Sequence, residues 1–441
     1  MQWKASEMTS SAIANIPSLW REMSGARSEL PSLQNDRDTD VVIVGGGYTG
    51  LAAAHRLIER GVAPVVLEAN RIGWGASGRN GGVVSAKVRQ SFPAIAAQHG
   101  LETARSVHRL CHTAVDELEA LIDSLGLTQA GFRRCGNLRC AHHERAFKSI
   151  ADEAEWLQRA LGDGDQHVLS AEAVRDETGS RAFFGGVLSE GVGTLLPLAY
   201  VEGLAEVLVK RHGLALFERT PATGIRRTDG GVSVITPGGE VRARQVILAT
   251  NAYSGQTEAG ERIRTRMVPF RSSIIATEPL PPALQQRLLV NNRSYGETRR
   301  MMRWFRKVDG RFLFGGRGAF GKHDSRAAFD ALQRSMISLF PDLADVKIAY
   351  RWSGHVGMTL DAIPHVGRFD DRMVFAAGYN GAGVSLSNYL GRLAADFSLG
   401  ENPDVSLLGA TNFRRVPCYP LREFGIRLTA GWYQLLDAMG R

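Results

Sequence analysis

Residues 40–50 read Asp-Val-Val-Ile-Val-Gly-Gly-Gly-Tyr-Thr-Gly, a short β-branched run that ends in a cluster of glycines. An apolar run of this length predicts a buried parallel strand. Apolar residues recur at helical spacing from Leu51 to Ile58, and residues 64–68 form a second short apolar run. The stretch therefore predicts a strand–helix–strand unit with a right-handed crossover.

The glycines have the spacing G-x-G-x-x-G, which is typical of a dinucleotide site. Gly45 permits a tight turn, Gly47 lets a pyrophosphate approach the backbone, and Gly50 lets the helix pack on the strand. Glu68 stands 18 residues after Gly50, close to the spacing of about 20 for a carboxylate that binds ribose hydroxyls. The helix N-terminus would face the phosphates. A purely structural turn is the alternative.

A second glycine-rich stretch, residues 71–82, follows Glu68 closely. It carries the hydrogen-bonding side chains of Ser77, Arg79 and Asn80 on a backbone that can fold tightly. Such a loop suits a long, extended cofactor, so it favours FAD over NAD. A flexible surface loop is the alternative.

Composition and charge describe an ordinary globular chain of 441 residues with a net charge of +8. The basic residues are scattered, so no nucleic-acid partner is expected. The four cysteines have no zinc-ligand or redox-pair spacing, so no metal site is expected and a reducing compartment is favoured. No signal peptide and no apolar run of membrane-spanning length are recognised. We expect a cytoplasmic protein with no membrane contact.

The order of the remaining elements predicts a discontinuous nucleotide domain. Helices dominate residues 95–160, with a strand near 133–141, and residues 265–320 are β-rich. A last buried strand at 373–377 leads into a glycine turn and a helix near 384–397. Strand–glycine–helix units therefore lie at both ends of the chain, with a second domain between them.

Several blocks of the sequence resemble the D-amino-acid-oxidase (DAO) type of FAD-dependent oxidoreductases, and above all the γ-glutamylputrescine oxidase branch. The resemblance covers roughly residues 35–441. It is carried by residues 40–51, 67–69, 75–82, 196–198, 249–253, 351–354, 364–368, 378–384 and 415–417.

The resemblance implies an α/β fold with a Rossmann-like FAD domain of the glutathione-reductase type and an inserted β-rich α+β substrate domain. We expect an N-terminal arm at 1–39, anchored by Trp20, and a C-terminal helical tail at 401–441. The FAD domain is expected to comprise 40–90, 150–255 and 345–400. The substrate domain is expected to comprise 91–149 and 256–344.

By the same resemblance, non-covalent FAD would be held by residues spread along the chain. The expected set is Gly45, Gly47, Tyr48, Thr49, Gly50, Glu68, Ala69, Ser77, Gly78, Arg79, Asn80, Gly81, Gly82, Ala222, Ala249, Thr250, Asn251, Gly354, Gly378, Gly381, Ala382, Gly383 and Val384.

Flavin-dependent amine oxidation needs position and desolvation more than reactive side chains. The pocket candidates are Trp352, His355, Tyr379 and Asn380, with Arg303, Trp304 and Arg306 as possible roof residues. For the tryptophans, packing is the alternative role; for the arginines it is a solvated face, and for His355 a structural role.

This chain departs from the relatives it resembles at informative positions. His355-Val356 stand where glycine oxidases place a carboxylate-binding arginine, and Leu313 stands where sarcosine oxidases carry an oxygen-activating lysine. Leu196 and Ala382 stand where the nearest branch often has histidine. These departures bear on the substrate and on the electron acceptor.

The resemblance implies oxidation of a primary or secondary amine, either γ-glutamylputrescine-like or an N-substituted amino acid. Hydride transfer to the flavin, hydrolysis of the imine and reoxidation by O2 to give H2O2 would follow, in polyamine catabolism. The alternatives are a dehydrogenase that passes electrons to another acceptor, and a non-catalytic accessory flavoprotein.

Overall fold

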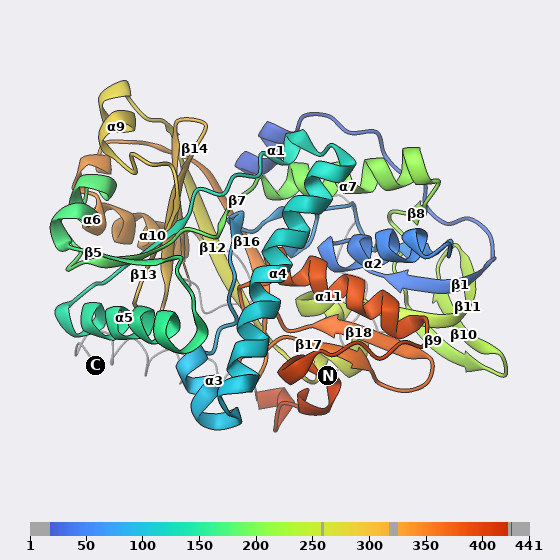
Figure 1. Ribbon diagram of the computed structural model, residues 1–441. Helices are drawn as coiled ribbons and strands as arrows, with labels where there is room; N and C mark the ends of the chain where they lie inside the picture. The colour runs from blue at the N-terminus through green and yellow to red at the C-terminus, as the bar shows by residue number, and fades with distance from the viewer. Residues whose placement is uncertain (1–17, 257–259, 317–324, 422–424, 426–441) are drawn as a thin grey trace.

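The structure is a computed structural model that describes residues 18–256, 260–316, 325–421 and 425. Two eight-stranded sheets organise it, one on each side of the molecule (Figure 1). Residues 1–17 of the expected arm, and residues 422–424 and 426–441 of the expected C-terminal tail, lie outside the described residues. Residues 401–421 of that tail form only the short turns η8 (Ser406–Leu408), η9 (Ala410–Asn412) and η10 (Tyr419–Leu421).

The first sheet contains the strand that leads into the glycine stretch. It runs in the order β17 (His365–Arg368), β18 (Met373–Ala377), β11 (Gly239–Leu248), β1 (Arg37–Val44), β2 (Val65–Leu67) and β8 (Ala215–Phe217). β10 (Gly231–Thr236) pairs with β11, and β9 (Gly224–Thr228) pairs with β10. The four strands β18, β11, β1 and β2 pair in parallel, as does β8 with β2.

Both faces of this sheet are covered, which is why β1 is apolar without alternation. Val41 and Ile43 pack into a cluster with the helices, whereas Val42 and Val44 pack with the β9–β10 side. The covering helices are α2 (Tyr48–Glu59), α4 (Leu101–Leu125), α7 (Pro197–His212) and α11 (Gly383–Ser398). The strand–helix–strand unit and the helix after the last strand are therefore confirmed.

The second sheet lies beside the first (left in Figure 1). Its order is β16 (Ile348–Met358), β12 (Val268–Pro279), β15 (Arg311–Gly316), β14 (Arg303–Val308), β13 (Ser294–Glu297), β4 (Asn137–Cys140), β6 (Gly186–Ser189) and β5 (Gln166–Leu169). Ile274 and Trp352 pack into the same hydrophobic cluster as the helices that cover the first sheet. Ile275 and Phe314 pack instead with α10 (Arg326–Leu339).

Membership of the two sheets differs from the expected domain boundaries at three places. β5 and β6 join the second sheet although residues 150–255 were expected in the first domain, and so does β16 from the segment 345–400. In the opposite direction, α3 (Phe92–His99) and α4 pack with the first sheet's helices. A strand of four residues does not encode its partner, because β4 pairs with β13 from about 150 positions away.

The N-terminal arm is anchored as expected. Trp20 on α1 (Leu19–Ser24) is 1% exposed, and its indole N–H donates to the carbonyl oxygen of Asn80 at 2.9 Å. Its ring meets that of Trp352 edge-on, at 6.0 Å between centroids. The arm therefore packs directly on the second glycine loop.

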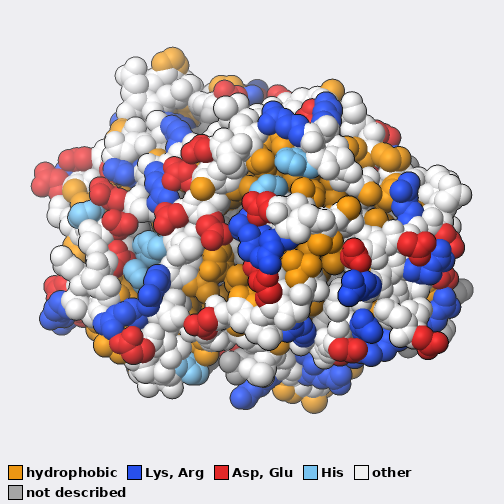
Figure 2. All heavy atoms as spheres, turned by 45° about the vertical axis from the view of Figure 1, so that its right-hand side comes forward, with side chains coloured by type: hydrophobic (Ala, Val, Ile, Leu, Met, Phe, Trp, Pro, Cys, Tyr) orange, Lys and Arg blue, Asp and Glu red, His pale blue; other side chains and the backbone are white. Residues whose placement is uncertain are grey.

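Two surface properties bear on partners. Figure 2 shows acidic and basic side chains interspersed over the displayed face. In the part of the chain that the structure describes, no helix is both long and apolar enough to cross a membrane. All four cysteines are free thiols.

Candidate cofactor and active site

The turn after β1 tolerates only glycine at the positions that close it. Gly45 has φ +110°, and a Cβ there would meet the carbonyl oxygen of Ala249 at 2.9 Å. A Cβ on Gly50 would meet the carbonyl oxygen of Gly45 at 1.9 Å, which no side chain could occupy. The turn therefore holds the start of α2 tightly against the sheet.

The N-terminus of α2 is open to a ligand. Its N-cap residue is Gly47, which offers no capping side chain. Tyr48 N–H donates to the hydroxyl oxygen of Ser77 at 3.0 Å, so this hydroxyl lies directly in front of the helix end. Free N–H groups and the positive end of the helix dipole favour an anion here.

Glu68 is held by the backbone on both sides of its carboxylate. Its two oxygens accept from Gly46 N–H at 2.8 Å and from Asn70 N–H at 2.9 Å. Burial raises the pKa of Glu68, although these two hydrogen bonds oppose that rise. Each carboxylate oxygen keeps acceptor capacity for ribose hydroxyls.

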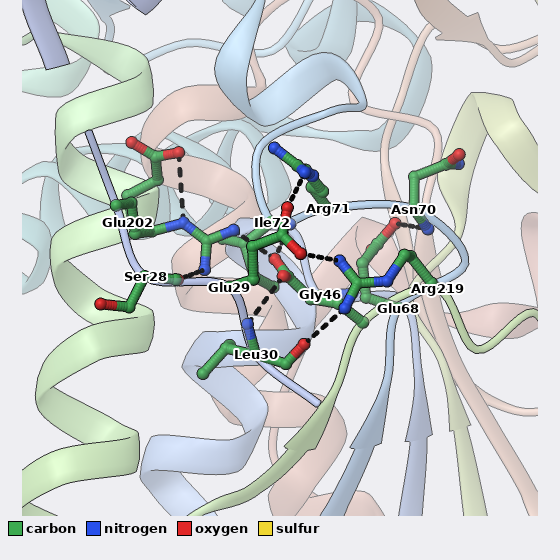
Figure 3. A network of polar contacts seen from close by, with 12 residues as sticks. Ser28, Glu29, Leu30, Gly46, Glu68, Asn70, Arg71, Ile72, Glu202 and Arg219 are labelled. Carbon is green, nitrogen blue, oxygen red and sulfur yellow. Dashed lines mark hydrogen bonds and ion pairs between the residues drawn. The ribbon is translucent and has the colours of Figure 1, made fainter. Parts of the chain in front are cut away.

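A polar network fixes the loop behind Glu68 (Figure 3). Its centre is Glu218, which is fully buried and accepts from Ile72 N–H at 2.7 Å and from Leu30 N–H at 3.2 Å. Arg27 forms an ion pair with Glu218 and lies 3.4 Å from Glu202 on α7. We call residues 27–33 the N-terminal strap, because they tie the loop after β2 to α7.

One large cavity runs along these elements and encloses about 1270 Å³ of empty space, including the part open to solvent. We call the part of its wall formed by Gly45, Gly47, Glu68 and Ser77 the glycine-turn end. We call the part formed by Trp74, Tyr253 and His355 the aromatic end. The Tyr253 ring lies 5.4 Å from that of Trp74 and 5.5 Å from that of His355.

Most of the expected cofactor residues line this cavity. Those that do are Gly45, Gly47, Tyr48, Thr49, Glu68, Ala69, Ser77, Asn80, Ala222, Ala249, Thr250, Asn251, Gly381, Gly383 and Val384. The first residues of α11 are among them, so that helix also directs its N-terminus toward the cavity. The remaining expected residues are not among those that line the cavity: Gly50, Gly78, Arg79, Gly81, Gly82, Gly354, Gly378 and Ala382.

Of the four pocket candidates, His355 and Tyr379 line the cavity and two do not. Tyr379 exchanges a 2.7 Å hydrogen bond with Thr49, and burial raises its pKa. His355 donates its backbone N–H to the hydroxyl of Tyr253 at 3.2 Å. These contacts fix two phenols on the wall of the cavity.

The other two candidates, Trp352 and Asn380, do not line the cavity, and both form hydrogen bonds within the protein. Trp352 is fully buried, and its indole N–H donates to the carbonyl oxygen of Arg79 at 2.9 Å. The Asn380 amide oxygen accepts from Thr359 N–H at 2.9 Å, and its φ of +53° closes the turn before α11. The sequence pattern placed both near the cavity but could not show which way their side chains point.

Two of the expected roof residues, Arg306 and Trp304, contact the second glycine loop, whereas Arg303 pairs with Glu297. Arg306 is buried and donates to the carbonyl oxygens of Gly81, Gly82 and Leu195 at 3.0–3.1 Å. Burial lowers its pKa to about 10. Trp304 lies against Gly81 and Gly315, where any Cβ would overlap its ring. Arg303 lies 3.3 Å from Glu297. The second sheet therefore positions this loop.

Sequence reasoning missed several lining residues. They are Val44, Leu67, Asn70, Gly73, Trp74, Gly75, Ala76, Tyr253, Val356, Gly357 and Ser387. Trp74, Gly75 and Ala76 belong to the glycine-rich stretch that was singled out, and Tyr253 ends the block 249–253. Their position within these blocks of sequence was the signal that could have identified them as lining residues.

The site's residues fit FAD. The glycine turn leaves no room for side chains where a pyrophosphate would approach, the Glu68 carboxylate lines the cavity where it could accept from ribose hydroxyls, and the N-terminus of α11 also meets the cavity. The chain matches the family model described as FAD dependent oxidoreductase (DAO) over residues 40–397. The protein thus belongs to the DAO family of FAD-dependent oxidoreductases, and its cofactor is FAD.

Relatives and solved structures agree with this assignment. The chain is 32% identical to γ-glutamylputrescine oxidoreductase of Escherichia coli, over 91% of this chain and 93% of that one. It is 30% identical to the probable oxidoreductase OrdL of Haemophilus influenzae, over 93% and 94%. The crystal structure of glycine oxidase from Geobacillus kaustophilus superposes with a TM-score of 0.72 at 21% identity, covering 85% of this chain and 99% of that one.

Proposed function

We propose that this protein oxidises an amine of the γ-glutamylputrescine type, at the carbon next to the nitrogen. The observation that carries the proposal is the single cavity in which a dinucleotide site continues into an aromatic chamber. FAD, when bound, supplies the two-electron acceptor. The similarity to γ-glutamylputrescine oxidoreductase supports the substrate class.

The aromatic end suits an extended amine. Trp74, Tyr253 and His355 offer ring faces and edges that desolvate a carbon chain, and ring faces attract a cationic amine. The Arg79 guanidinium already stacks on Trp74, at 4.8 Å from the ring centroid, which limits how a second cation could use that face. We infer that Tyr253 and His355 orient the substrate, with Tyr379 and Thr49 forming the wall opposite.

The chamber's makeup also bears on the chemistry. Aligned nucleophile–base pairs of the hydrolase type are not found among the described lining residues, whose side chains are mainly small, aromatic or amide. Catalysis by position and desolvation needs no such pair. We propose that the imine product is released for hydrolysis by water.

Two fates of the electrons are distinguished by specific observations. The likeness in fold to glycine oxidases supports O2 as the acceptor, with H2O2 as its product. In contrast, no lysine stands among the described residues that line the cavity, and Leu313 is fully buried in the core. This second observation favours a dehydrogenase that passes its electrons to another acceptor.

The experiment is an anaerobic amine panel on the purified holoenzyme, followed by admission of oxygen. We expect γ-glutamylputrescine to bleach the flavin absorption faster than putrescine, sarcosine, pipecolate or 4-methylaminobutyrate. Reduction by sarcosine alone would contradict the substrate class. Rapid return of the colour in air, with H2O2 formed, supports the oxidase; a colour that returns only slowly supports the dehydrogenase.

We also infer that FAD is held without a covalent bond through cysteine. Cys111, Cys135 and Cys140 lie elsewhere in the fold, and Cys418 is exposed. Denaturation with acid should release the entire flavin into the supernatant, and flavin that stays with the precipitate would contradict the inference.

A further inference from the structure

A second group of polar side chains lies far from the cofactor cavity, where α4 meets the loop that leads into β5. His108 and His112 are four residues apart on α4, so both imidazoles project from one face of the helix. Asp163 faces them from the loop after η4 (Leu157–Leu161). One ligand atom from each of the three lies within 4.8 Å of the other two.

The distances converge on a single carboxylate oxygen. Asp163 Oδ2 lies 3.0 Å from His108 Nε2 and 3.9 Å from His112 Nε2. An ordinary histidine–carboxylate hydrogen bond explains why His108 lies beside Asp163. The position of His112 is not explained in this way, because 3.9 Å is too long for a hydrogen bond. The two imidazoles are nevertheless held with their ring centroids 4.4 Å apart.

The carboxylate is fixed by neighbours, as metal-binding carboxylates usually are. Asp163 is buried, its Oδ1 accepts from Asp165 N–H at 3.0 Å, and its Oδ2 accepts from the Gln166 amide at 3.1 Å. Ser189 in turn donates to Gln166 at 2.7 Å.

There is also room for a fourth ligand. His112 and Asp163 line a second cavity with about 780 Å³ of empty space, to which Asp165 and Gln166 also contribute. Two imidazoles, one carboxylate and a water in an open position form a ligand set that Zn²⁺ prefers in tetrahedral sites. Small rotations of the imidazoles would bring both Nε2 atoms to bonding distance of one ion.

We propose that His108, His112 and Asp163 bind one Zn²⁺ ion that ties α4 to the edge of the second sheet. The ion replaces the hydrogen bond between His108 and Asp163, and water from the second cavity completes its coordination. Since α4 packs with the FAD domain's helices and β5 belongs to the second sheet, the ion joins the two halves of the molecule. No metal site was expected from the sequence, in which the aspartate lies 51 positions from the second histidine.

The test is Zn²⁺ titration of the tag-free, chelator-treated holoenzyme by calorimetry, with the bound metal counted by mass spectrometry. We expect one Zn²⁺ per chain and a rise in the melting temperature. His112→Gln should weaken Zn²⁺ binding by more than the roughly 10–100-fold typical of outer-shell changes. Gln166→Leu, which removes such an outer-shell partner, should stay within that range.

His99→Gln is the matched control, because His99 is an exposed histidine at the end of the neighbouring helix α3. It should bind Zn²⁺ like the unaltered protein. No stoichiometric binding by the unaltered protein, or equal binding by His112→Gln, would overturn the proposal.

X-ray absorption by the Zn²⁺-loaded, unaltered holoenzyme gives a result that does not depend on whether a variant folds. Two imidazoles in the first shell support the site. A shell of oxygen atoms alone would overturn it. In the Co²⁺-substituted holoenzyme, tetrahedral d–d bands to the red of the flavin absorption are expected, and octahedral bands would contradict the proposed geometry.

Discussion

At the glycine-turn end of the cavity, backbone N–H groups hold the side chains of the wall in place. The aromatic end is formed by side chains that come from distant segments. Gly46, Tyr48 and Asn70 present N–H groups to Glu68 and Ser77, all within a stretch of about 30 residues. Trp74, Tyr253 and His355 come instead from three segments spread over about 280 positions. The glycine-turn end is therefore encoded locally, whereas the aromatic end depends on how distant segments of the chain fold together.

The largest effect is expected at the glycine-turn end. In Gly50→Ala the added methyl would overlap the carbonyl oxygen of Gly45, so the turn must open. We expect FAD affinity to fall about 100-fold, as for overpacking that costs about 3 kcal/mol. Flavin retained per chain, read from the absorption spectrum, is the measurement. Gly230→Ala is the control, since its Cβ would meet nothing within 4 Å; equal flavin loss in both would show that the turn is not special.

The N-terminal strap gives the next effect. Arg27→Ala leaves the buried Glu218 carboxylate without its cation, which typically costs about 3 kcal/mol of folding free energy. Urea unfolding of the holoenzyme measures it. Arg71→Ala on the same loop removes only the exposed pair with Glu29 and should cost less than about 1 kcal/mol. If both variants unfold alike, the strap does not support the cofactor loop.

At the aromatic end, substitutions of His355 and Trp352 distinguish a residue that lines the cavity from one that packs in the core. His355→Ala should lower kcat/KM roughly 10-fold, about 1.4 kcal/mol, while FAD content stays unchanged. Trp352→Phe removes the bond to Arg79 and should lower stability by about 1 kcal/mol, with kcat per bound flavin preserved. The opposite pattern, activity lost in Trp352→Phe and kept in His355→Ala, would exchange the roles assigned to them.

The smallest expected effect is on pH dependence. The pKa of Glu68 lies above its ordinary value of 4.5 because the group is buried. The ionised form accepts hydrogen bonds from ribose hydroxyls, so protonation weakens FAD binding as the pH falls toward that raised pKa. Flavin fluorescence titrations measure the affinity. In Glu68→Gln this dependence should vanish; its persistence would assign it to another group.

The sequence could predict the glycine-turn end of the cavity better than the aromatic end. The glycine spacing and Glu68 are local, so they identified the strand–helix–strand unit and a dinucleotide site. The nearby stretch 71–82 favoured FAD, and blocks along the whole chain carried the resemblance to the family. Trp352 and His355 stand three positions apart on β16, so strand alternation places their side chains on opposite faces, and only His355 lines the cavity. Which face meets the cavity depends on distant partners, such as Trp20 against Trp352. The pairing of β4 with β6 and β13 likewise depends on distant partners that no local pattern encodes.

The central claim is that one cavity binds FAD at its glycine-turn end and an amine at its aromatic end. The most direct test is an anaerobic titration of the purified protein with γ-glutamylputrescine, followed through the flavin absorption. The account predicts one FAD per chain and complete bleaching by a stoichiometric amount of the amine. A protein that carries its full complement of FAD and stays oxidised with every amine offered would contradict it.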